Sequence, residues 1–390
     1  MKYRIDWKLA GLKENPFTIS PPTDSEQAIW AGLNVIKDEF YSVFKETKGS
    51  APTQVVLCRG DFGGGKTHAS LFFSSKKNIP DTSPSVKYIE IFRVQTPTGT
   101  KDPVRDFYLD IMEQIGLEKI GEMVNKTVGS VGPDVFKRTL RQKMVSGDFV
   151  NALLELGNSP LYPTHNPLLS PYFLGNCSNT ELRKLGLNRN IEKTQDYFRV
   201  LAGVFQCFIG LSESNDVAEH NRFCLWIDEM ENFIYFTPPQ YRPFGQGLRE
   251  LVDRLPYFFT LFMNFTLTAP EGYEEIELIL GGYLTDRITQ DIFFNEMKNQ
   301  EEMMRYVSDV LSNYRTPEEP KTPYSPFTEE ALGTLMANLQ QRTPRNINKR
   351  CHRVLMIAFE KGIFEKGKDP AITLDFIREM DQEELDKEIG

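Results

Sequence analysis

A glycine cluster between two apolar runs is the feature that most constrains the fold. The stretch VVLCRGDFGGGKTHASLFF begins as a short apolar run, typical of a strand buried on both faces, and ends as an apolar helix. Between them, residues 60–67 fit the pattern G-x-x-x-x-G-K-[ST]. Glycines let the backbone wrap around a phosphate with its N–H groups pointing inward, and the next helix turns its positive end to the same anion. The sequence therefore predicts a strand–loop–helix unit that binds phosphate.

The side chains of this loop indicate which phosphate compound it holds. Lys66 would place a charge at the β- and γ-phosphates of a nucleotide, and Thr67 would offer a hydroxyl to Mg²⁺. The alternative interpretation is a glycine-rich turn with an incidental Lys-Thr pair. The predicted nucleotide-contacting residues are Gly60, Phe62, Gly63, Gly64, Gly65, Lys66, Thr67 and His68.

A second apolar run, FCLWIDEMEN, ends in acidic residues. Asp228 would hold Mg²⁺ through water, and Glu229 would orient and deprotonate the attacking water molecule. Glu231 is a weaker candidate that the sequence also allows as a surface residue. The alternative interpretation is an ordinary strand end with solvated acids. Together, the two motifs predict a chain that binds and hydrolyses Mg-ATP.

Strand-like and helical segments alternate along much of the chain, which predicts an α/β fold with a mostly parallel sheet and helices on both faces. The two motifs lie farther apart than a simple strand–helix–strand unit requires, so residues 100–195 are predicted to be a helical insertion. We expect an entry loop and helix in residues 1–50, an ATPase core in 51–290, a helical lid in 291–365 and a charged tail in 366–390, of which the segment REMDQEELDKEIG is expected to fray. Residues 158–179 are predicted to be an irregular loop, and residues 313–328 a linker.

The first helix is predicted from its apolar spacing. Its apolar positions are Ile29, Leu33, Ile36, Phe40 and Val43, and Asp24 or Ser25 is expected to cap it.

Composition excludes several classes of protein. The 390 residues include 45 Lys and Arg against 54 Asp and Glu, and the net charge of −9 argues against a broad non-specific nucleic-acid binder. The sequence has no apolar run long enough to cross a membrane and no signal peptide, so we expect a cytoplasmic protein with no membrane partner. The five cysteines lack metal-ligand spacing and are predicted to be reduced and buried. The four histidines are scattered, which disfavours a zinc site.

The order of motifs resembles that of an AAA+ ATPase across roughly residues 11–362. The run GKT-helix, strand-DE, strand-T, helix-R is followed by a helical segment that contains TPRNIN, and the pattern is most similar to the origin-recognition and initiator clade. The segment GLKENPF resembles the entry loop of that clade. The segments GKTH, LWIDEMENF and LGNCSNTELRKLGL resemble the ATPases of BREX-type phage-defence and mobile-element systems.

This resemblance implies further site residues. Thr268, or alternatively Asn264, would be the sensor that positions the lytic water. Arg287 would reach the γ-phosphate of a neighbouring subunit, and Arg345 would report the nucleotide state from the lid. Pro16 and Phe17 would line the adenine pocket. The alternatives are a strand-end hydroxyl for Thr268, a salt-bridged surface arginine for Arg287 and a surface residue near a helix start for Arg345.

The sequence departs from the initiator pattern in two places. The segment IWAGLNVI lacks the arginine that initiator relatives carry there, and the residues after MIAFEKG are too few and too acidic for a winged-helix DNA reader. The sequence therefore predicts an AAA+ ATPase that assembles with itself and with double-stranded DNA and that regulates or loads a partner protein. The setting would be anti-phage defence or a mobile element, with an effector nuclease, a transposase or another defence subunit as the partner.

Three alternatives to this function stay open: a STAND-type nucleotide switch, a replication initiator or loader, and a scaffold with a structural nucleotide site. Basic segments at residues 137–143 and 345–353 are candidates for DNA contact, although solvated helix faces would have the same composition.

Overall fold

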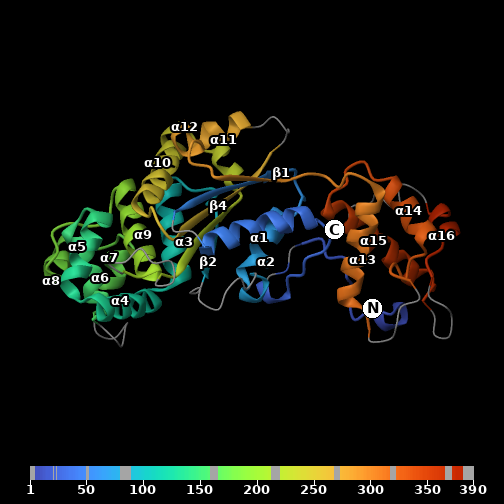
Figure 1. The fold of residues 1–390 in the computed structure, drawn as a ribbon, viewed down its shortest axis with the longest axis horizontal. Helices are drawn as coiled ribbons and strands as arrows, with labels where there is room; N and C mark the ends of the chain where they lie inside the picture. Colours follow the sequence, from blue (N-terminus) through green and yellow to red (C-terminus); the bar gives the residue numbers. More distant parts are fainter. Residues whose placement is uncertain are drawn as a thin grey trace. The chain divides into compact units, whose positions relative to one another are not determined.

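The computed structural model describes residues 5–20, 22, 24–49, 52–79, 89–158, 166–211, 220–267, 273–316, 322–364 and 371–380 (Figure 1). The chain divides into two compact units. The first unit comprises Met1–Phe40, Gly60–Asn78 and Phe293–Gly390, and the second comprises Tyr41–Arg59 and Ile79–Ile292. Segments far apart in the sequence therefore build each unit.

A five-stranded sheet forms the centre of the second unit, and its strands are β1 (Gln54–Gly60), β2 (Ile89–Gln95), β3 (Arg222–Asp228), β4 (Phe259–Thr266) and β5 (Gln290–Phe294). The order in the sheet is β2-β3-β4-β1-β5. Strand β3 is parallel to both β2 and β4, and Ile227 pairs with Val94 on one side and Met263 on the other. The last residues of β1 and β5 are counted with the first unit. The predicted α/β fold with a parallel sheet is confirmed.

The central strands are largely apolar because both faces of the sheet are covered. Successive side chains of a strand point to opposite faces. Phe223, Leu225 and Ile227 of β3 belong to the main core of the unit. Trp226 points the other way and stacks on Phe262 of β4, with 4.2 Å between the ring centroids.

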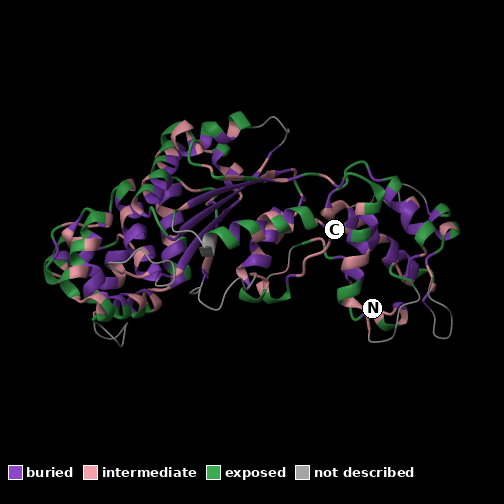
Figure 2. Ribbon diagram, viewed as in Figure 1, coloured by how far each residue is buried: buried purple, intermediate pink, exposed green. Residues whose placement is uncertain are grey.

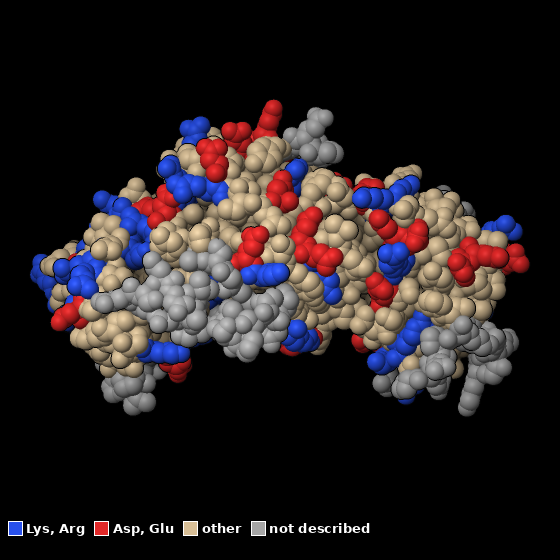
Figure 3. All heavy atoms as spheres, viewed as in Figure 1, with Lys and Arg blue, Asp and Glu red and all other residues tan. Residues whose placement is uncertain are grey.

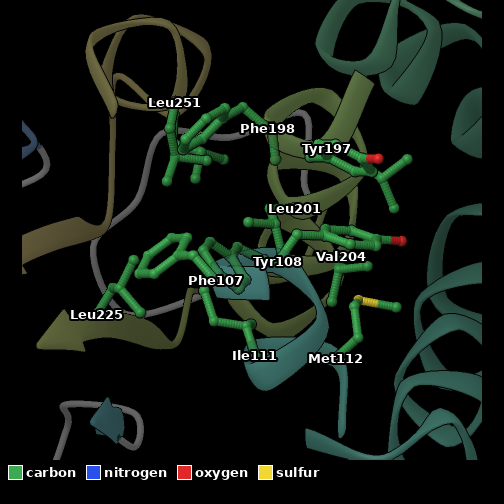
Figure 4. Close-up of a cluster of buried hydrophobic side chains, with 14 of the residues drawn as sticks. Phe107, Tyr108, Ile111, Met112, Tyr197, Phe198, Leu201, Val204, Leu225 and Leu251 are labelled. Carbon is green, nitrogen blue, oxygen red and sulfur yellow. The ribbon is translucent and has the colours of Figure 1, made fainter. Parts of the chain in front are cut away.

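The covering helices on the core side include α3 (Pro103–Ile115), α9 (Thr194–Ile209) and α10 (Pro238–Arg254). Figure 4 shows the side chains of α3 and α9 meeting Leu225 of β3 and Leu251 of α10. Local signals place these helices: Asp102 accepts a hydrogen bond from the backbone of Arg105 at the start of α3, and Thr237 forms a capping box with Gln240 at the start of α10. The opposite face is covered in part by α1 (Asn34–Gly49), whose Phe44 contacts Phe262.

The predicted insertion is helical in its described part. It contains α4 (Leu117–Val131), α5 (Pro133–Met144), α6 (Gly147–Gly157), α7 (Leu169–Phe173) and α8 (Asn179–Lys184). The prediction of an irregular loop at residues 158–179 is wrong for α7, because Tyr172 and Phe173 are fully buried and hold that short helix against the core. Figure 2 shows this helical group with a buried interior and an exposed outer layer, and the buried residues are mostly apolar. After β3 the chain forms a 3₁₀ helix (Met230–Tyr235), and α11 (Tyr273–Leu280) and α12 (Gly282–Thr285) precede β5.

The first unit contains α2 (Lys66–Ser74) and the helices α13 (Gln300–Tyr314), α14 (Glu329–Ala337), α15 (Pro344–Glu360) and α16 (Leu374–Arg378). It also holds short 3₁₀ helices at Trp7–Ala10, Ser25–Gln27 and Lys76–Asn78. A separate hydrophobic cluster joins the N-terminal segment to α13–α16, and the entry-loop residue Phe17 lies within it.

The first helix begins later than its apolar spacing predicts. It starts at Asn34, and Asp24 caps the 3₁₀ helix Ser25–Gln27 instead. Gly32 and Leu33 have positive φ angles of 53° and 49°, which end any helix approaching from Ile29. The turn is held because the backbone N–H of Gly32 donates to Asp309 Oδ2 at 2.9 Å.

Two predictions for the C-terminal third are also wrong. Strand β5 occupies residues predicted to be helical or to lie at the domain boundary. Residues 313–328 do not separate domains, since Phe327 is buried in the same cluster as α13 and α14. Helix α16 ends at the first residue of the segment predicted to fray, and it buries Phe376 and Ile377 in that cluster.

The predictions about the cysteines and about membrane-spanning segments can be compared with the structure. All five cysteines are free and buried, as predicted. Within the described residues, none of the helices combines the length and the apolar character that a membrane crossing requires.

Candidate nucleotide site

The predicted phosphate loop connects β1 to α2 and belongs to the first unit. Gly60, Gly63 and Gly65 adopt φ angles of 146°, 81° and 108°, in the region that favours glycine. Gly65 is the N-cap of α2 and supplies no capping side chain, so no side chain masks the first N–H groups of the helix. This end of α2 has the backbone geometry of an anion site.

Lys66 lies inside the loop that it follows. Its Nζ donates hydrogen bonds to the carbonyl oxygens of Gly60 and Asp61, each at 2.8 Å. The side chain is buried. Thr67 lies in the first turn of α2 and is half-buried. The loop therefore holds the lysine ammonium in a fixed place at the start of the helix.

Arg345 contacts this loop from the start of α15, and its role as a reporter of the nucleotide state stays a prediction. Thr343 caps α15 and Pro344 opens it, which places Arg345 in the first turn. The guanidinium lies 4.2 Å from the ring centroid of Phe62, and the Arg345 backbone N–H donates to the carbonyl oxygen of Gly63 at 3.4 Å. The structure therefore brings together two residues predicted separately, Phe62 and Arg345.

The other predicted site residues of the first unit, His68, Pro16 and Phe17, are packed against other protein groups. His68 Nε2 lies 2.5 Å from the carbonyl oxygen of Ile29, and burial lowers the pKa of the His68 imidazole. Phe17 is 0% exposed and meets Phe327 edge to face. Pro16 is buried as well. Packing accounts for the positions of Pro16 and Phe17, and their adenine contact stays a prediction.

The predicted acids belong to the second unit. Asp228 ends β3 and is 2% exposed. Its Oδ1 accepts from Asn264 Nδ2 at 2.9 Å, and its Oδ2 accepts from Arg93 Nη2 at 2.7 Å. Asn264 also accepts from Trp226 Nε1, so a buried network orients the Asp228 carboxylate. Of the two sensor candidates, Asn264 contacts Asp228, and Thr268 lies outside the described residues.

Glu229 has an unusual backbone and a perturbed carboxyl. Its φ of 60° and ψ of 40° lie in the left-handed region, which is uncommon for a residue with a side chain. Burial raises the pKa of the Glu229 carboxyl, and the neighbouring carboxylates of Asp228 and Glu231 raise this pKa further. Asn232 Nδ2 donates to Glu229 Oε2 at 3.3 Å. A raised pKa suits a group that takes a proton during a reaction.

Glu231 has a defined contact. Its Oε2 accepts from the backbone N–H of Thr266 at 2.9 Å, which ties the segment after β3 to the end of β4.

Arg287 follows α12 and forms an ion pair with Asp253 Oδ1 at 2.9 Å. Both side chains are partly exposed. This ion pair matches the alternative interpretation of Arg287 as a salt-bridged surface arginine. Its contact with the γ-phosphate of a second subunit stays a prediction.

Sequence analysis missed Arg93. A signal was present, because this arginine interrupts the otherwise apolar part of the strand IEIFRVQ. Its partner Asp228 lies 135 residues away, and no local pattern connects the two.

Comparisons with known proteins give structural neighbours only, since neither a protein-family model nor a curated protein matches the sequence. An ORC1 protein of Aeropyrum pernix, solved in complex with DNA, is 8% identical, with a TM-score of 0.44 over 90% of this chain and 65% of that chain. The Drosophila ORC bound to DNA is 10% identical, with a TM-score of 0.49 over 97% of this chain and 68% of that one. The chain thus spans slightly less than two thirds of the Aeropyrum protein chain. Its own parallel sheet, phosphate loop and helical C-terminal segment give it an α/β P-loop fold.

Proposed function

We propose that the protein is an AAA+ ATPase that binds and hydrolyses Mg-ATP. The observation that carries this proposal is the phosphate loop, in which Lys66 is fixed by two loop carbonyls at the uncapped start of α2. The N–H groups of the loop would bind the phosphates, and Lys66 would neutralise the β- and γ-phosphates. Arg345 would contact the γ-phosphate, because it already lies on the same loop.

Magnesium would be held jointly by protein and nucleotide. Among the described residues, no three His, Cys, Asp or Glu side chains form a group that could hold a metal ion. Mg²⁺ commonly keeps its waters and binds through one or two protein oxygens together with phosphates. We assign the Thr67 hydroxyl and the Asp228 carboxylate to this role. The contacts of Asp228 with Asn264 and Arg93 support it, because they orient both carboxylate oxygens.

Glu229 would activate the attacking water. Glu229 is the next residue after Asp228, and burial together with two neighbouring acids raises the pKa of the Glu229 carboxyl. Asn264 would help to position that water, with Thr268 as the alternative. Arg287 would stabilise the transition state in a neighbouring subunit, so that turnover depends on self-assembly.

The wider role is proposed from the sequence resemblance. The protein would assemble with itself and with double-stranded DNA, and would regulate or load a partner protein. The setting in anti-phage defence or a mobile element stays a prediction of that resemblance. The alternatives are a STAND-type switch, in which bound nucleotide rather than turnover carries the signal, and a replication initiator or loader.

The first test is ATP turnover measured over a range of protein concentrations, with and without double-stranded DNA. Glu229→Gln should keep ATP binding and lower turnover about 10²- to 10⁴-fold, as expected for loss of a general base. Glu274→Gln is the matched control, because it removes one exposed carboxylate at the start of α11. If the Glu229→Gln variant turned over ATP as fast as the wild type, the assigned mechanism would be contradicted. Tightly retained nucleotide without wild-type turnover would favour the switch.

Subunit mixing tests the role of Arg287. Arg287→Ala and Glu229→Gln should each be inactive alone. An equimolar mixture should regain activity, because the Glu229→Gln chain supplies Arg287 to an intact neighbouring site. A mixture as inactive as its components would refute action between subunits.

A further inference from the structure

We propose that the hollow where α5 and α10 end is a docking site for the phosphate backbone of double-stranded DNA. This inference rests on the DNA association in the proposed function and gives that association a place on the second unit. The hollow has a volume of about 660 Å³. The lining residues that could contact phosphate are Lys143, Arg249, Arg254, Gln142, Gln195 and Gln246.

Positive charge exceeds negative charge at this hollow. Its two acidic lining residues, Glu250 and Asp253, are already shared among arginines. The ion pairs are Arg199–Glu250 at 3.0 Å, Arg254–Glu250 at 2.5 Å, Arg249–Asp253 at 3.4 Å and Arg287–Asp253 at 2.9 Å. Within the lining itself, the two carboxylates therefore face three cations, Lys143, Arg249 and Arg254. Because the whole chain carries a net charge of −9, this surplus is a local feature.

The two helix ends hold each other through Lys143 and Arg254. Lys143 Nζ donates to the carbonyl oxygen of Arg254 at 2.6 Å, and Arg254 Nη1 donates to the carbonyl oxygen of Lys143 at 2.9 Å. Each cation thus caps the C-terminus of the other helix, where positive charge is favourable. Burial and the nearby Arg254 lower the pKa of Lys143. The wall of the hollow is therefore built by fixed cations and does not require ordering when a ligand arrives.

Exposed cations extend from the hollow along both helices. On α5, Arg138 lies one turn before Gln142 and shares its face. On α10, Arg242 lies one turn before Gln246, and Arg249 follows on the same face. Figure 3 shows Lys and Arg atoms gathered over the part of the second unit where Figure 1 places α5, α9 and α10. A row of charges on each side of a polar hollow suits a long anion rather than a single ion.

The lining chemistry favours duplex phosphates over other anions. Arginine, lysine and glutamine are donors commonly used for phosphate oxygens. Peptide recognition by a groove commonly uses apolar anchors, and the lining offers only Pro256 and Tyr283; an acidic peptide bound by arginines is the alternative that polyglutamate tests below. Single-stranded nucleic acid needs aromatic stacking platforms, whereas the Tyr283 ring already lies under the Arg249 guanidinium at 5.4 Å.

The other basic segment, residues 345–353, is a poorer candidate. Arg345 lies on the Phe62 ring, and Arg350 is buried within the first unit. These two cations of the segment are therefore used inside the first unit. Residues 137–143 carry exposed cations, and their helix ends at the hollow.

The test is duplex binding measured by fluorescence anisotropy across salt concentrations with the full chain. The variant Arg138→Ala/Arg249→Ala removes one exposed cation from each row. The matched control Lys126→Ala/Lys184→Ala removes two exposed cations from other helices of the same unit. Each lost phosphate contact lowers the log–log salt slope by about 0.9. Between about 50 and 200 mM salt, the affinity of the variant should therefore fall about tenfold less than that of the wild type.

The outcomes separate this inference from the proposed function. A lower slope in the variant alone, with unchanged basal ATP turnover, supports the docking site. Equal slopes in the wild type, variant and control would overturn the site while leaving DNA association in place. A wild type that turns over ATP but binds no duplex would remove the DNA association and the docking site together. Displacement of the duplex by polyglutamate at equal charge, or tighter binding of a single strand, would also overturn the duplex assignment.

Discussion

The contact between Phe62 and Arg345 makes a prediction about nucleotide selectivity. The Arg345 guanidinium lies 4.2 Å from the Phe62 ring centroid, and the Phe62 side chain is otherwise 69% exposed. In the proposed function, Arg345 contacts the γ-phosphate, which ADP lacks. Arg345 has to leave the ring to make that contact, so the stack competes with ATP but not with ADP.

The magnitude follows from the exposure of the ring. A cation–π contact at an exposed site contributes about 0.5–1 kcal/mol, which leaves Arg345 unstacked in roughly 16–30% of molecules. The apparent dissociation constant rises in inverse proportion to the competent fraction. Phe62→Ala should therefore tighten ATP binding about three- to sixfold relative to ADP binding.

The assay is equilibrium titration of a fluorescent ATP analogue, with ADP measured by competition. Phe62→Tyr is the matched control, because it keeps an aromatic face for Arg345. A double-mutant cycle adds Arg345→Ala, in whose background Phe62→Ala should have no effect on ATP binding. The reasoning is refuted if Phe62→Ala strengthens ADP binding equally, or if its gain persists without Arg345.

Two further predictions concern pH and packing. Because Glu229 must be ionised to accept a proton, kcat/KM should fall as the pH is lowered through the raised pKa of its carboxyl. Glu231→Gln removes one cause of the raised pKa and should move the acid limb of the pH–rate profile to lower pH. An acid limb that does not move would contradict the assignment of Glu229 as the base. A Cβ at Gly247 of α10 would lie 1.9 Å from a ring carbon of Phe198, so Gly247→Ala should lower the free energy of unfolding by about 1–3 kcal/mol in chemical denaturation. Gly129→Ala on α4, where nothing lies within 4 Å, should not destabilise, and equal losses in both variants would refute the packing argument.

The elements that local chemistry dictates could be predicted from the sequence. Strand β1, the phosphate loop and α2 followed from an apolar run, glycines and a Lys-Thr pair, because few other structures use that order of residues. Strand β3 was recognisable because it has an uninterrupted apolar run, FCLWI, that is followed at once by Asp228 and Glu229. Such segments carry their own structural signal.

Contacts between distant segments could not be predicted in the same way. The α1 start depends on a turn that Asp309 holds from far along the chain, although Leu33 fits the helical spacing. Strand β5 has only five residues and no turn signal that marks it within a helical region. The pairing of Arg93 with Asp228 likewise requires knowledge that β2 lies beside β3. In each case a tertiary contact decided what the local pattern left open.

The phosphate loop shows how both kinds of information meet in one motif. The sequence pattern assigns these glycines to phosphate binding, but two of them are also required by close contacts with neighbouring protein atoms. A Cβ at Gly60 would lie 2.4 Å from the carbonyl oxygen of Phe294, and a Cβ at Gly63 would lie 2.8 Å from Arg345 Cβ. At Gly65 the nearest atom would be 3.9 Å away, so its φ of 108° is what favours glycine there. The start of α15 can approach the loop only because Gly63 has no side chain, and in the proposed function the same approach would bring Arg345 to the bound phosphate.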